Sequence, residues 1–95
     1  MKRDARDPTI RLFSALAHPS RLVIVECLGR GERNVSGLLQ CRELRACSQP
    51  NLSQHLSVLR NAGVVTARRE GHQVWYRLAN PRLVRWVQTG LRMGQ

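Results

Sequence analysis

The sequence has few acidic and few aromatic residues, and it has no long apolar segment. Only 6 of its 95 residues are Asp or Glu, and aromatic residues make up 4% of the chain. No apolar run reaches the 18 residues that a transmembrane helix needs. The charged N-terminal residues also lack the apolar centre of a signal peptide. We therefore expect one cytoplasmic domain over residues 1–95, without membrane contact.

The same shortages argue against an enzyme and against a disulfide-stabilised scaffold. The sequence has no carboxylate pair, no Ser-His-Asp order and no phosphate-binding glycine loop. Its 3 cysteines are an odd number in an ordinary composition, and the cytosol would keep them reduced.

Positive charge is abundant. The chain carries 16 Lys and Arg residues and a net charge of +10, and every basic residue except Lys2 is Arg. Codon bias would explain the preference for Arg over Lys but not the excess charge. Because the planar guanidinium group binds phosphate through two parallel hydrogen bonds, this surplus favours a nucleic-acid partner.

Residues 48–62 have the pattern of a complete helix with two chemically different faces. Ser48 is a good N-cap, Pro50 suits the first turn, and Gly63 suits the position after the helix. Apolar residues recur at helical spacing and predict a buried stripe. This stripe comprises Leu52, Leu56, Val58, Leu59 and Ala62.

The opposite face of this helix carries amides and hydroxyls that can both donate and accept hydrogen bonds. It comprises Gln49, Asn51, Ser53, Gln54, His55, Ser57 and Arg60. Such groups match base edges, which present donors and acceptors side by side. A solvated polar face is the alternative, but no carboxylate occurs anywhere between Ser48 and Arg69.

The remaining periodicity predicts a mainly α fold in the order α-α-α-α-β-β-α. Helices are expected over residues 8–18, 19–28 and 35–45 and after Asn80, with Asp7, Asn34 and Asn80 as N-caps. His18 is expected to cap the second helix rather than to bind a metal. The third helix and the Ser48 helix form a helix-turn-helix.

Two alternating runs, 64–69 and 73–78, predict a β-hairpin that turns at Gly71. Arg68, Arg69 and His72 lie near its tip, where they would form a phosphate clamp or a merely solvated turn. Val74, Tyr76 and Leu78 share one face and are expected in the core, which turns Trp75 outward or toward a partner.

The first and last helices are more apolar than a small monomer can cover. The last helix contains Leu83, Val84, Trp86, Val87 and Leu91. We expect the two helices to pair with their counterparts in a homodimer. The alternative is that they cover the back of their own domain.

From Leu12 to Leu78 the chain resembles the ArsR/SmtB family of winged helix-turn-helix transcriptional repressors. The resemblance rests on four segments in order: Ala17-His18-Pro19-Ser20-Arg21-Leu22, Ser48-Gln49-Pro50-Asn51-Leu52-Ser53-Gln54-His55-Leu56, Val58-Leu59-Arg60-Asn61-Ala62-Gly63-Val64-Val65, and Arg68-Arg69-Glu70-Gly71 with Val74-Trp75-Tyr76-Arg77-Leu78. It implies a homodimer on a partly palindromic double-stranded operator, released by an effector. It also implies DNA reading by Ser48, Gln49, Asn51, Ser53, Gln54 and His55, and wing contacts by Arg68, Arg69 and His72.

The chain departs from this family at its effector sites. Residues 34–38 lack the cysteines of the arsenic-sensing pattern, and residues 81–95 contain no Asp, Glu, His or Cys for a zinc-type site. Cys27 is near, but not at, the position of a persulfide-sensing cysteine. The stretch that carries Cys41 and Cys47 is longer than usual for the family.

Cys41 and Cys47 are therefore the candidate effector site. Cys47 directly precedes the cap of the Ser48 helix, where the helix dipole and the nearby arginines favour a reactive thiol. The pair could bind arsenite or a soft metal ion, or undergo oxidation. Alternatively, both cysteines are packing residues, as we expect for Cys27. An effector-independent, architectural nucleic-acid-binding protein is the competing function.

Overall fold

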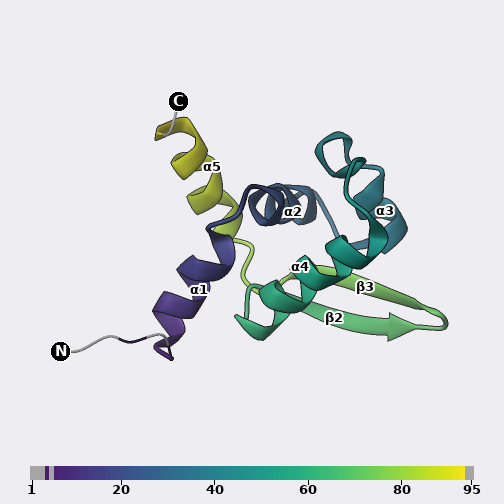
Figure 1. Ribbon diagram of the computed structural model, residues 1–95, viewed down its shortest axis with the longest axis horizontal. Helices are drawn as coiled ribbons and strands as arrows, with labels where there is room; N and C mark the ends of the chain where they lie inside the picture. Colours follow the sequence, from purple (N-terminus) through teal and green to yellow (C-terminus); the bar gives the residue numbers. More distant parts are fainter. Residues whose placement is uncertain (1–3, 5, 94–95) are drawn as a thin grey trace.

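The computed structural model describes residue 4 and residues 6–93. The chain folds into α1 (Pro8–Leu16), α2 (Pro19–Gly29), β1 (Arg33–Asn34), α3 (Val35–Leu39) and the 3-10 turn η1 (Arg42–Leu44). It continues through α4 (Gln49–Asn61), β2 (Val65–Glu70), β3 (Gln73–Leu78) and α5 (Leu83–Met93). The β2–β3 hairpin projects from the helical body, and α1 and α5 lie on the side away from its tip (Figure 1).

The strands form one antiparallel sheet in the order β1-β3-β2. Gly71, at φ +63°, makes the predicted turn between β2 and β3. On the other side of β3, Asn34 of β1 pairs with Trp75, and its amide donates to Gln73 Oε1 at 2.9 Å. The sequence did not predict β1, because two residues are too few to show an alternating pattern.

Predicted caps begin the helices and explain where they start. The side chains of Asp7, Asn34 and Ser48 accept hydrogen bonds from backbone N–H groups of α1, α3 and α4. His18 caps α2 as predicted, because its Nδ1 accepts from the backbone N–H of Ser20 at 3.2 Å. Asn80 Oδ1 accepts from the backbone N–H of Arg82 in the turn that leads into α5.

Two predicted helix ends were wrong. α1 stops at Leu16, because His18 adopts an extended conformation to cap α2. The third helix stops at Leu39 instead of continuing to Arg45, and the chain then forms η1. Leu44 of η1 is nevertheless fully buried.

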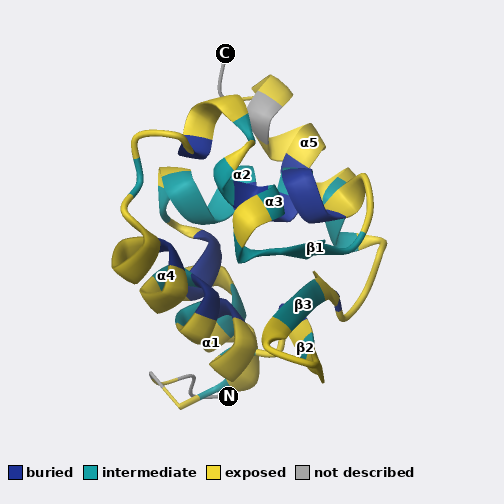
Figure 2. Cartoon of the chain, turned by 90° about the vertical axis from the view of Figure 1, so that its right-hand side faces the viewer, coloured by how far each residue is buried: buried dark blue, intermediate teal, exposed yellow. Residues whose placement is uncertain are grey.

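The core lies between α2, α3, η1, α4 and the base of the hairpin. α2 is central, with Ile24 and Val25 fully buried. The side of α4 that faces the core is buried, and its opposite side is exposed (Figure 2). The buried set is Ala15, Leu16, Ile24, Val25, Cys27, Leu28, Leu38, Leu44, Leu52, Leu56, Leu59, Val64, Val65, Leu78 and Val87.

No single helix among the described residues is long and apolar enough to cross a membrane. α1 and α2 together have the length and apolar composition of a membrane span, but the chain bends by 95° between them.

Candidate nucleic-acid interface

Helix α4 is fixed at both ends by its own sequence. Ser48 Oγ accepts from the backbone N–H of Asn51 at 3.2 Å. At the other end Gly63 takes a positive φ of +79°, and the backbone N–H of Val64 donates to the carbonyl of Leu59 at 2.9 Å. This is the Schellman arrangement, which satisfies the last carbonyls and turns the chain into the hairpin. The helix is therefore a rigid support for its side chains.

The two faces of α4 are separated as predicted. Leu52, Leu56 and Leu59 are completely buried, whereas the amide and hydroxyl side chains are exposed. The exposed set is Gln49, Asn51, Ser53, Gln54, Ser57 and Arg60, with Ser48 exposed at the cap. An exposed helix face that carries neutral donors and acceptors matches the groups on base edges in a major groove.

His55 differs from its neighbours on this face because it is half-buried and bound to α2. Its Nδ1 accepts from Nε of Arg21 at 3.2 Å, and its ring lies 4.5 Å from the ring of His18. Burial, followed by the charges of His18 and Arg21, lowers the pKa of His55. An accepting Nδ1 requires the neutral ring with its proton on Nε2. His55 thus joins α4 to the start of α2.

The hairpin places Arg69 and His72 in exposed positions near its tip. Behind the tip, a hollow of about 400 Å³ separates the hairpin from the C-terminal turn of α4. Arg60, Arg68 and Arg69 all line it, with Ala67 and Val74. The fold therefore gathers three of the predicted DNA-contacting arginines around one depression, although they come from two elements.

Arg68 is already bound by carboxylates of its own chain. Its Nε and Nη2 donate to the two oxygens of Glu32 at 3.0 and 2.7 Å, and its Nη1 donates to Glu70. Its guanidinium also lies 5.9 Å from the centre of the half-buried Trp75 ring. These bonds raise the pKa of Arg68 and lower the pKa of Glu32.

The Glu32 contact was missed because nothing in the sequence connects two residues that are 36 positions apart. It forms because β1 joins the sheet beside β3 and brings the residue before β1 to the hairpin. Arg68 therefore braces the wing, and part of its charge is neutralised.

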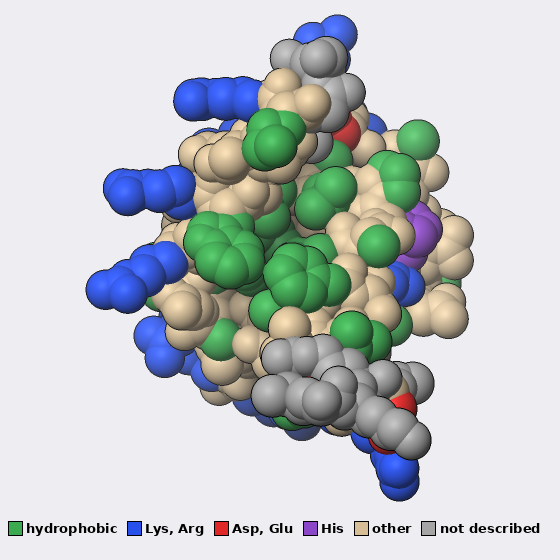
Figure 3. All heavy atoms as spheres, turned by 90° about the vertical axis from the view of Figure 1, so that its left-hand side faces the viewer, with side chains coloured by type: hydrophobic (Ala, Val, Ile, Leu, Met, Phe, Trp, Pro, Cys, Tyr) green, Lys and Arg blue, Asp and Glu red, His purple; other side chains and the backbone are tan. Residues whose placement is uncertain are grey.

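A second exposed surface lies on the α1–α5 side, where apolar side chains gather (Figure 3). Phe13 and Trp86 stack there with ring centres 6.3 Å apart, although their residues are 49% and 64% exposed. Ile10 and Met93 are also exposed. The first and last helices thus carry apolar side chains that their own domain does not cover. The side chain of Leu91 lies outside the described residues.

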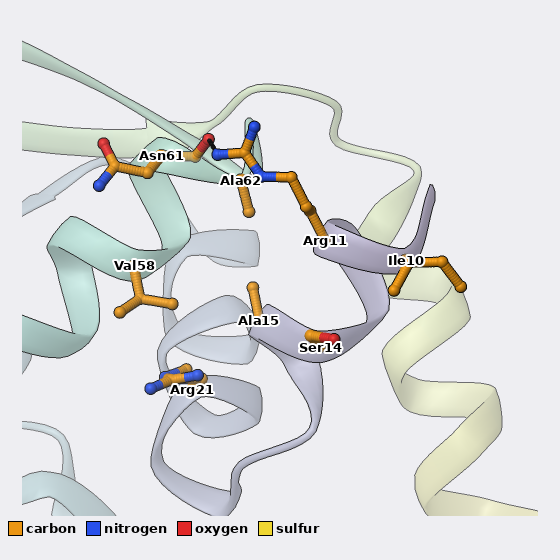
Figure 4. Close-up of a pocket in the computed structure, with 8 residues that line it drawn as sticks. All are labelled: Ile10, Arg11, Ser14, Ala15, Arg21, Val58, Asn61 and Ala62. Atoms are coloured by element: carbon orange, nitrogen blue, oxygen red, sulfur yellow. Dashed lines mark hydrogen bonds between the residues drawn. The ribbon is translucent and has the colours of Figure 1, made fainter. Parts of the chain in front are cut away.

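A small hollow of about 310 Å³ separates α1 from α4 (Figure 4). Arg11 reaches across its upper edge, and its Nη2 donates to the carbonyl of Asn61 at 2.9 Å. Arg21 and Val58 line the opposite part. This contact fixes α1 to the end of α4.

The cysteines occupy three environments. Cys27 is buried in α2, as predicted, with Nη2 of Arg30 donating to its sulfur at 3.5 Å. Cys41 precedes η1 and is half-buried, and its thiol donates weakly to the carbonyl of Gly37 at 4.0 Å. Cys47 is half-buried before the cap of α4.

The α3–α4 pair, the exposed face of α4 and the basic hairpin define a winged helix-turn-helix domain of the kind found in transcriptional regulators. Residues 18–67 match the family model described as bacterial regulatory protein, arsR family. The chain belongs to this ArsR family, as its sequence indicated.

Two relatives and one solved structure illustrate the similarity. The chain is 42% identical to a biofilm growth-associated repressor of Agrobacterium fabrum, over 93% of this chain and 72% of that protein. It is 43% identical to a probable mercury resistance operon repressor of Streptomyces lividans, over 81% of this chain and 59% of that protein. The latter relative is thus considerably longer than the matched region.

The solved structure is the homodimeric winged helix-turn-helix DNA-binding domain Mb0332 from Mycobacterium bovis, determined in solution. It superposes with a TM-score of 0.76 at 29% identity, over 98% of this chain and 87% of that one. The chain is therefore a transcriptional regulator by family and by fold, and not an enzyme.

Proposed function

We propose that this protein is a cytoplasmic, homodimeric repressor that binds a specific operator in double-stranded DNA. The observation that carries the proposal is the exposed, carboxylate-free face of α4, which is held rigid by its two caps. On a helix of this kind, amide groups can pair with base edges in a major groove.

In this proposal the polar residues at the start of α4 read bases, and the basic residues around the wing hold phosphates. The base-reading set is Ser48, Gln49, Asn51, Ser53, Gln54 and His55. The phosphate-binding set is Arg60, Arg68, Arg69 and His72. Two members also serve their own fold, because Arg68 is bound to Glu32 and His55 is bound to Arg21.

The apolar α1–α5 face supports the proposed dimer. An exposed stack of Phe13 and Trp86 is costly in water, and a second subunit would cover it. The related Mycobacterium bovis domain is homodimeric. A two-fold dimer would place its two α4 helices in successive major grooves, roughly 34 Å apart.

We further propose that a thiol-reactive effector, such as arsenite, a soft metal ion or an oxidant, releases the DNA. Cys41 and Cys47 support this proposal because both lie in the segment that leads into α4. A relative is named as a probable mercury resistance repressor. Within the described residues, no group of three or more His, Cys, Asp or Glu side chains is placed to hold a metal ion.

Selection of duplexes from a random library, followed by footprinting of the enriched sequence, tests the DNA-binding proposal. We expect a two-fold symmetric site with half-sites about one helical turn apart, and an affinity that falls steeply with salt. Equal binding to all duplexes, with no enriched sequence, would support the architectural alternative instead.

A further inference from the structure

A groove runs between the end of α2, the end of β3 and the start of α5. It consists of two adjoining hollows of about 760 and 450 Å³, both lined by Gly29, Pro81 and Val84. Arginines from each of these regions line the hollows, and we refer to the whole as the basic groove. They are Arg30, Arg77, Arg82 and Arg85. None of them belongs to the set proposed to hold operator phosphates.

The chain itself does not neutralise these arginines. All four are exposed, and none forms an ion pair with a carboxylate of the described residues. Arg30 donates to the sulfur of Cys27. Arg77 donates to Oγ1 of Thr66, so both acceptors are neutral. Residues 81–95 contain no Asp or Glu, and the groove therefore keeps its positive charge.

Glu32 is a carboxylate at the edge of the groove, but it is bound to another residue. It lines the smaller hollow, and its two oxygens accept hydrogen bonds from Arg68 at 3.0 and 2.7 Å. These bonds, with a smaller effect from the charge of Arg77, lower the pKa of Glu32. Glu32 thus offsets part of the charge of Arg77 without forming an ion pair with it.

The groove faces away from α4. Leu78 of β3 is buried in the core, and successive strand residues point to opposite faces of a sheet, so Arg77 points outward. Val74, which points to the same side as Leu78, lines the hollow between the hairpin and α4. Lys and Arg side chains project mainly from the left edge of the face in Figure 3, whereas a histidine marks the opposite side. DNA on α4 therefore leaves the groove uncovered.

The proposed dimer face also lies apart from the arginine side of α5. Arg85, Gln88 and Arg92 recur at helical spacing and form one exposed stripe. Trp86 follows Arg85 in the sequence and is therefore rotated from it by about 100° around the helix axis. A second subunit that covers Trp86, which also lines the larger hollow, does not need to cover this stripe.

The charge pattern favours DNA over a protein partner. A planar guanidinium group binds phosphate through two parallel hydrogen bonds. Phosphates recur along a duplex, so one DNA backbone can meet arginines from several elements. The centre of a protein interface is depleted of charged residues, whereas arginines line both hollows of the groove.

We propose that the basic groove binds the phosphate backbone of a second DNA duplex. The domain then holds two stretches of DNA on opposite sides, one through α4 and one through the groove. When both stretches belong to one DNA molecule, the second is present at a high effective concentration. This inference rests on the proposed function, because α4 holds the first duplex.

A capture experiment with two duplexes tests the proposal. A biotinylated duplex that carries the selected operator is immobilised and saturated with the full-length protein, and a fluorescent duplex of unrelated sequence is then added. We expect the wild type to capture the second duplex. Arg82→Ala/Arg85→Ala should lose most of this capture but keep its affinity for the operator. The slope of log capture affinity against log salt should decrease by about two, since each phosphate contact contributes about 0.9.

Arg42→Ala/Arg45→Ala is the matched control. It removes the same charge from exposed residues that line neither hollow. Its capture, expressed per protein retained on the operator, should equal that of the wild type. An equal loss in both double variants would show that capture follows net charge and would overturn the assignment to the groove. Thermal unfolding of each variant before the experiment shows that it is folded.

The other outcomes also decide the proposal. Undiminished capture by Arg82→Ala/Arg85→Ala would overturn it. Release of the second duplex by tripolyphosphate or by polyglutamate at a matched concentration of charge would assign the groove to a small polyphosphate or to an acidic protein instead. A protein that selects no operator would refute the proposed function. The groove is then tested by binding of the unrelated duplex in solution, where Arg82→Ala/Arg85→Ala must lose more affinity than Arg42→Ala/Arg45→Ala.

Discussion

Gly29 is the point where α2 approaches α5, and a methyl group added there has no room. A Cβ atom built on Gly29 would lie 3.0 Å from Cγ1 of Val84 and closer still to Cγ2. Because α2 and α5 pack along this contact, either Val84 or the whole of α5 must move. Overpacking of this kind typically costs about 1–3 kcal/mol.

The expected result for Gly29→Ala is therefore a lower free energy of unfolding, although alanine usually favours a helix. In a domain of this size, a loss of 1 kcal/mol lowers the melting temperature by about 4–8 °C. Because α5 carries Trp86, the variant should also weaken self-association. Thermal unfolding followed by circular dichroism measures the first effect, and sedimentation equilibrium measures the second.

Gly90 provides the matched control. It lies in α5, and a Cβ atom built there meets nothing within 4 Å. Gly90→Ala should therefore stabilise the protein by about 0.5–1 kcal/mol. Adding Val84→Ala to Gly29→Ala should recover part of the loss. If Gly29→Ala melts at or above the wild-type temperature, as Gly90→Ala should, the reasoning about this contact is wrong.

Three further predictions concern the wing, the histidine pair and the dimer face. Arg69→Ala should weaken binding to all duplexes alike and reduce the slope of log affinity against log salt by about one. Titration of DNA at several salt concentrations measures both effects. A loss confined to one DNA sequence would contradict the role of Arg69 as a phosphate contact. The fold lowers the pKa of His55, so at a pH near 6 the unfolded chain binds more protons than the folded chain. The free energy of unfolding should therefore fall as the pH drops through about 6.5, the pKa of an unperturbed histidine. In urea unfolding, His55→Gln should show a weaker pH dependence of the free energy of unfolding than the wild type. The same pH dependence in both proteins would refute the role of His55. Trp86→Arg should shift the protein towards monomer in sedimentation equilibrium at micromolar concentration, whereas an unchanged dimer would place the interface elsewhere.

The features of the fold that could be predicted from the sequence depend on neighbouring residues. Ser48, Gly63 and the leucine stripe of α4 follow from capping chemistry and helical spacing, and the structure confirms them. The turn at Gly71 follows from the same kind of local signal. The alternating runs predicted the hairpin, the apolar surplus of the terminal helices predicted a dimer, and the family resemblance implied both as well.

The features that could not be predicted depend on tertiary contacts. β1 exists only because β3 lies beside it, and it brings Glu32 to Arg68. The third helix ends early because residues 40–45 bury Leu44 by means of a 3-10 turn.

The most direct test of the account compares the affinity of wild type and Gln54→Ala for the selected operator and for a scrambled duplex of the same length. Gln54 is exposed on α4, so its removal should leave the fold intact. Loss of a good base contact is worth about 1–3 kcal/mol of discrimination. The account predicts a lower operator-to-scrambled affinity ratio with nearly unchanged binding to scrambled DNA. An unchanged ratio would contradict base reading by α4.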